Sequence, residues 1–128
     1  MAETSKRTKH LIREYAAAAH EAELHRALLP LAGAFKQWER GELDSFTLQD
    51  LIHRFHQGAA RDLYLRYASN GLEPALAHAI ATGALERAAV PAEVLGHLAG
   101  LLDFYRDLLA ESYEQAFRMN KHERRPGC

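Results

Sequence analysis

Two histidines three residues apart, His53 and His56, stand in the segment LIHRFHQGAARDLYLRY, residues 51–67. Imidazole nitrogens bind zinc and other transition metals, and Asp50 or Gln57 would add an oxygen ligand. A zinc site needs at least three protein ligands at one point, so the others would have to come from another helix. His53, His56 and Asp50 are therefore candidate ligands of a metal-dependent enzyme, which is our first alternative function.

A protein-contact surface is the second interpretation of the same segment. At 100° per residue on a helix, one polar stripe opposite the apolar side contains His53, Gln57, Arg61 and Tyr64. Tyrosine and arginine are enriched at interface hot spots because they bury a large area and keep a polar group. The spacing predicts these four residues as interface candidates.

The sequence lacks the motifs that mark common enzyme sites. It contains no glycine-rich phosphate loop, no serine nucleophile elbow and no HExxH. Catalytic groups can also come from separated segments that leave no local motif, so the question of enzymatic activity stays open. We expect a non-catalytic protein that uses no cofactor.

The charge of the chain is close to balanced, with 16 Lys and Arg against 17 Asp and Glu. This composition gives no overall positive field that would attract a nucleic acid. Basic residues do gather near both ends, within residues 6–13 and 118–125. Cations at a helix C-terminus also complement its dipole. A nucleic-acid-binding accessory role through basic termini is our second alternative, and we do not expect nucleic acid as the main partner.

The compartment is predicted from the single cysteine, Cys128, which allows no intrachain disulfide and is typical of a reducing setting. The N-terminal segment is charged and lacks the apolar run of a signal peptide. No run approaches the roughly 20 apolar residues that span a membrane. We expect a soluble, cytoplasmic protein with no membrane partner.

Helical spacing of apolar residues recurs along nearly the whole chain, without an alternating run of strand length. One stripe has members four, three, four and three residues apart: Leu24, Leu28, Leu31, Phe35 and Trp38. The stripe keeps its phase through Pro30. Because proline removes a helical hydrogen bond, we predict a long first helix, about residues 8–40, with a kink.

Three further helices are predicted, at about residues 45–69, 74–88 and 92–120, the first of them capped by Asp44. In the last helix one position of a seven-residue repeat is occupied by Leu95, Leu102, Leu109 and Ala116, and two more positions are largely apolar. Three apolar positions per heptad are typical of a bundle helix that touches two neighbours.

The predicted fold class is all-α: a single-domain bundle of four or five helices with a long kinked first helix and a long last helix. The domain spans residues 1–128, with about 1–7 and 121–128 frayed. The expected core consists of Leu28, Leu31, Phe35, Leu51, Ile52, Phe55, Leu63, Ile80, Leu98, Leu101, Leu102, Tyr105 and Leu108.

The helices 45–69 and 92–120 each carry candidate contact residues outside their apolar core face. This is more contact surface than a minimal monomeric bundle needs. We therefore expect the protein to act by protein–protein interaction, with a protein partner or as a homo-oligomer. An adaptor, a complex subunit or a toxin-neutralising partner would fit this description.

Overall fold

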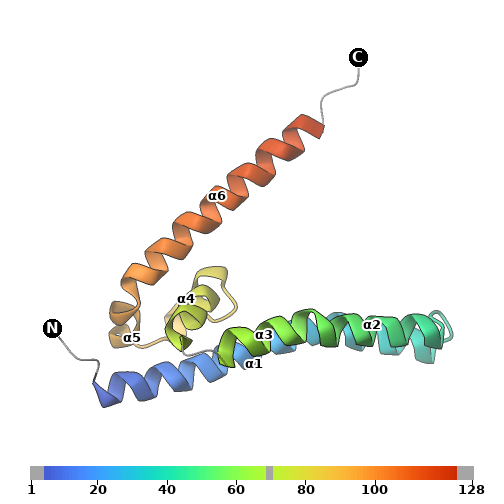
Figure 1. The fold of residues 1–128 in the computed structure, drawn as a ribbon, viewed down its shortest axis with the longest axis horizontal. Helices are drawn as coiled ribbons and strands as arrows, with labels where there is room; N and C mark the ends of the chain where they lie inside the picture. The colour runs from blue at the N-terminus through green and yellow to red at the C-terminus, as the bar shows by residue number, and fades with distance from the viewer. Residues whose placement is uncertain (1–4, 69–70, 124–128) are drawn as a thin grey trace.

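The computed structural model describes residues 5–68 and 71–123, which are almost entirely helical and contain no strand (Figure 1). The all-α fold with long first and last helices is thereby confirmed. The elements follow in the order α1 (Lys6–Glu39), α2 (Ser45–Gln57), α3 (Ala59–Ala68), α4 (Leu72–Thr82), the 3₁₀ turn η1 (Arg87–Ala89), α5 (Ala92–His97) and α6 (Ala99–Glu123).

Side-chain caps begin the first two helices. The hydroxyl of Ser5 accepts the Thr8 N–H at 3.0 Å, and the Asp44 carboxylate accepts the Thr47 N–H at 2.7 Å. This hydrogen bond favours the charged form and lowers the pKa of Asp44. Helix α1 continues through Pro30, as the unbroken apolar phase predicts. It begins at Lys6, and α6 extends to Glu123, so the helices reach further into the predicted frayed ends than expected; residues 1–4 and 124–128 lie outside the described residues.

The prediction of one continuous helix over residues 45–69 was wrong, because Gly58 divides it into α2 and α3. Gly58 has φ −104° and ψ −98°. A Cβ at this position would lie 2.8 Å from the carbonyl oxygen of Arg54, so only glycine fits without a shift. Hydrogen bonds from Gly58 to Arg54 (2.8 Å) and from Asp62 to Gly58 (2.9 Å) still bridge the break. The two segments therefore run end to end along α1 (Figure 1).

The other predicted helices are also shorter or divided. Helix α4 ends at Gly83, whose φ of 81° is the left-handed conformation that favours glycine. The predicted helix 92–120 is interrupted at Leu98, which separates the short α5 from α6. None of the helices in the described part combines the length and the apolarity needed to cross a membrane.

The core lies at one end of the molecule, where α4 packs against α1, α3 and α6 (Figure 1). Small side chains let α1 and α4 approach closely, and Ala19, Ala77 and Ala79 are completely buried. The largest completely buried side chains are Leu76, Val94 and Leu98. The expected core left out the three alanines because alanine carries a weak hydrophobic signal, and it also left out Leu76 and Val94.

Four residues of the expected core are buried, namely Leu63, Ile80, Leu98 and Leu102. Four others are exposed, and their assignment to the core was wrong: Leu28, Phe35, Ile52 and Leu108. These residues lie on the apolar side of their own helices. In the part of the chain that the structure describes, however, no further helix packs over that side. Helix periodicity identifies an apolar face without saying what covers it.

Truncation of Leu76 to Ala should lower the free energy of unfolding by about 2–5 kcal/mol, because it leaves a cavity at a fully buried site. The control is Leu65→Ala on α3, where the side chain is 53% exposed and the loss should stay below about 1 kcal/mol. Urea denaturation measures both values. Equal losses in the two variants would contradict the placement of the core around α4.

Candidate functional site

The four predicted interface residues all lie on the surface. His53 and Gln57 belong to α2, Arg61 and Tyr64 belong to α3, and the break at Gly58 separates the two pairs. Tyr64 is 66% exposed, which is high for a tyrosine side chain. These residues remain accessible for contact, and their role in an interface stays a prediction.

The candidate metal ligands do not converge in the described part of the chain. Asp50, His53 and His56 are exposed, and the carboxylate of Asp50 forms an ion pair with Arg54 at 2.8 Å. Among residues 5–68 and 71–123, no group of three or more His, Cys, Asp or Glu side chains is arranged to hold a metal ion. The metal-dependent alternative therefore has no ligand set among these residues.

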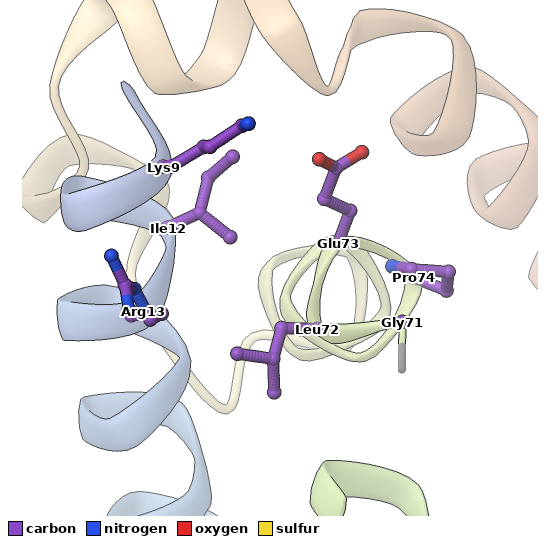
Figure 2. A pocket seen from close by; sticks show the side chains of 7 residues that line it. All are labelled: Lys9, Ile12, Arg13, Gly71, Leu72, Glu73 and Pro74. Atoms are coloured by element: carbon purple, nitrogen blue, oxygen red, sulfur yellow. The ribbon is translucent and has the colours of Figure 1, made fainter. Parts of the chain in front are cut away.

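The basic N-terminal segment is partly engaged with the rest of the fold. Nε of Arg7 donates to the Glu93 carboxylate on α5 at 2.9 Å. Lys9 and Arg13 line a cleft of about 490 Å³ between the starts of α1 and α4, together with Glu73 (Figure 2). Because Glu73 adds a carboxylate, which in turn lies 3.2 Å from His97, the cleft has mixed charge and is no dedicated anion site.

A polar cluster that the sequence analysis missed joins α1 to α3. The Tyr67 hydroxyl donates to Glu23 at 2.5 Å, and Arg66 donates to the same carboxylate at 3.2 Å. The Glu23 side chain is only 12% exposed, and the ring of His20 stacks on Tyr67 at 4.6 Å between centroids. The partners are 43 and 44 residues apart in sequence, so no local spacing could have indicated them.

Burial shifts the pKa of two titrating groups, Tyr67 within this cluster and His78 beside it. Desolvation, followed by the hydrogen bond and the charge of Glu23, raises the pKa of Tyr67 well above its usual range. Desolvation, followed by the charge of Arg66, lowers the pKa of His78 on α4, against a smaller opposing effect of Glu23. His78 packs edge-on against Tyr105 of α6 with its Nδ1 buried. Both shifts favour the neutral form of the side chain, and the ring contacts of Tyr67 with His20 and of His78 with Tyr105 join α1 to α3 and α4 to α6.

Two exposed apolar surfaces are the other features of the structure that can carry a function. The first is the outer half of α6, defined here as residues 106–119, which projects away from the other helices (Figure 1). Every residue from Ala110 to Met119 is exposed, and Tyr113 is 78% exposed. Tyr113, Phe117 and Met119 in this stretch are 62–78% exposed, whereas Leu102 is buried and Tyr105 is partly buried nearer the body of the fold.

The second surface is the hairpin seam, a set of large side chains on α1 and α2 that are each 39–41% exposed: Leu28, Phe35, Trp38 and Ile52. Trp38 and Phe35 contact each other edge to face, with 6.5 Å between ring centroids. The Trp38 indole N–H donates to the hydroxyl of Ser45 at 3.0 Å. Helix α2 packs mainly on α1 and α3, and the four side chains of the seam remain partly in contact with solvent.

Comparison with known proteins adds no assignment to these surfaces. No protein-family model matches the sequence, and neither the curated proteins nor the solved structures give a significant match.

Replacement of Tyr67 by Phe should change how stability depends on alkaline pH. Because the folded pKa of Tyr67 is raised, its contribution to stability is complete below the unfolded value of about 10 and is lost as pH rises towards the folded value. Urea denaturation between about pH 8 and pH 11 should show a shallower decline in Tyr67→Phe than in the wild type.

The matched control for this experiment is Tyr64→Phe, since Tyr64 lies on the neighbouring turn of α3 and is exposed. It should keep the wild-type decline above pH 10. A shallower decline in both variants would show that the cluster around Glu23 has no special part in the alkaline transition.

Proposed function

We propose that the protein acts without catalysis, by binding another protein molecule through its exposed apolar helices. An adaptor, a complex subunit or a toxin-neutralising partner in the cytoplasm would act in this way. The proposal depends on one observation above all: residues 110–119 of α6 are all exposed, and they include the large apolar side chains Tyr113, Phe117 and Met119. A face of this kind on a water-exposed helix is typical of a binding surface.

The energetics of an isolated helix support this proposal. Helical segments shorter than about 12–15 residues are marginal in water, and most helices in proteins gain their stability from packing of an apolar face. In the outer half of α6, Tyr113 and Met119 are 78% and 67% exposed, so these side chains gain little from packing on the described part of the chain. Covering one large apolar side chain contributes about 1.5–3 kcal/mol, so a partner would stabilise the helix and gain affinity together.

The stripe His53, Gln57, Arg61 and Tyr64 is a second proposed contact surface. Its supporting features are the high exposure of Tyr64 and the position of all four residues on the outer surface of α2 and α3. Tyrosine loses little conformational entropy on binding because it has few rotatable bonds, which suits it to a contact that forms and dissociates.

A charge at the centre of the exposed α6 face tests the main proposal. Ala116 occupies the predicted heptad position and is exposed, so Ala116→Glu should leave the chain folded by circular dichroism. Its association with the partner, whether a second protein or another copy, should weaken by at least about tenfold because a carboxylate would be buried. Affinity purification with quantitative mass spectrometry, together with light scattering, measures both kinds of association.

The matched control is Ala110→Glu, an equally exposed alanine on the same helix, about 120° away from Ala116 around the helix axis. It should retain the wild-type association. The proposal fails if the wild-type protein is a monomer that retains no stoichiometric partner, or if both variants bind as the wild type does.

The second surface gives a separate prediction. Reversal of charge at Arg61 combined with Tyr64→Ala should weaken association by roughly tenfold or more, since each is a residue type that dominates interface energies. The urea midpoint should stay within the range of a surface substitution, because both side chains are exposed. Wild-type affinity in this double variant would remove the α2–α3 stripe from the interface.

A further inference from the structure

The two exposed apolar surfaces cannot cover each other within one chain. The outer half of α6 and the α1–α2 hairpin diverge from the region of α4 and α5 (Figure 1). The contacts of α6 are with α4 and α5, whereas those of α2 are with α1 and α3. Among the described residues neither surface covers the other, which leaves each of them open to another molecule.

We propose that this molecule is a second copy of the chain. In this dimer, the outer half of α6 from each copy lies on the hairpin seam of the other. The inference rests on the proposed function and names its partner. Each chain supplies one outer half of α6 and one hairpin seam. A twofold exchange therefore covers both surfaces of both chains, and no surface is left to bind a third copy.

The exposed area is large enough for such an interface. The accessible surface of the chain is 9770 Å², whereas a compact monomer of this mass would expose about 6,800 Å². If the eleven residues outside the described ranges are given the full surface of an unfolded chain, an excess of about 1,500 Å² still remains. A stable dimer buries about 800 Å² on each partner. The excess therefore accommodates an interface of ordinary size.

The charges of the two surfaces are complementary. The outer half of α6, residues 106–119, carries three carboxylates (Asp107, Glu111 and Glu114) and two arginines, which leaves one net negative charge. Residues 25–39 of α1 carry Arg26, Lys36 and Glu39, which leaves one net positive charge, while Asp50 and Arg54 cancel within α2. The segments that form the hairpin seam thus have one net positive charge. Exchange pairs opposite charges, whereas direct pairing of two α6 helices would bring two negative segments together.

The lengths of the two surfaces also agree. At 1.5 Å per residue, the outer half of α6 is about 20 Å long, and the thirteen residues of α2 span about the same distance. Small residues at Ser112 and Ala116 leave room for the large side chains of a facing surface. The outer half of one α6 helix is therefore long enough to lie along the hairpin seam, from Ile52 to Trp38.

The only tryptophan of the chain, Trp38, lies in the seam and reports its cover directly. The experiment follows the purified full-length protein from micromolar to submillimolar concentration by sedimentation equilibrium and by acrylamide quenching of Trp38 fluorescence. We expect the mass to rise to twice 14.4 kDa and the quenching of Trp38 to fall over the same concentration range. In Ala116→Glu, the dimer should dissociate at least about tenfold more readily and Trp38 should be quenched as in the monomer. Ala110→Glu should behave as the wild type.

Three results would overturn the exchange. The first is a monomer at every concentration; if such a monomer still binds a different protein through α6, the proposed function survives while the dimer does not. The second is a dimer in which quenching of Trp38 is unchanged, which indicates pairing of the α6 helices with each other. The third is a dimer that Ala116→Glu leaves intact, since the interface would then lie elsewhere.

Discussion

Helix α4 packs against both long helices, and its burial determines where α1 and α6 lie. Five of its side chains are buried, and the completely buried alanines allow α1 to approach its backbone closely. The small residues Ala16 and Ala19 on α1 match those on α4, so the contact gains many dispersion interactions over a short length. The remaining parts of α1 and α6 extend from this contact in different directions (Figure 1).

A core confined to one end has a direct physical consequence for the rest of the chain. The α1–α2 hairpin and the outer half of α6 carry apolar side chains, yet each has fewer neighbours than a bundle helix requires. In a monomer this surface would remain in contact with water at a cost in free energy. In the proposed exchange, a second copy of the chain would cover this surface and remove that cost, which is the physical basis of the proposal.

The cluster around Glu23 has a different part in the fold. A nearly buried carboxylate is costly unless it is paired, and Tyr67 and Arg66 provide a hydroxyl and a guanidinium donor. These hydrogen bonds join α1 to α3 on the core side of the break at Gly58. They join the two helices at the inner end of the hairpin.

The sequence by itself determined the helices and the apolar face of each one, because both depend on interactions between residues a few positions apart. The Asp44 cap, the passage of α1 through Pro30 and the heptad positions of α6 belong to this local information. The break at Gly58 has a local cause, an unusual backbone conformation, but its signal is a single glycine within an otherwise regular pattern. Only the tertiary structure decided which apolar faces are covered. Leu102 and Leu108 both occupy apolar heptad positions of α6, yet Leu102 is buried and Leu108 is exposed. The difference arises because α4 packs against only part of α6. The pairing of Glu23 with Tyr67 was likewise decided by the packing of distant segments, which no spacing along the chain encodes.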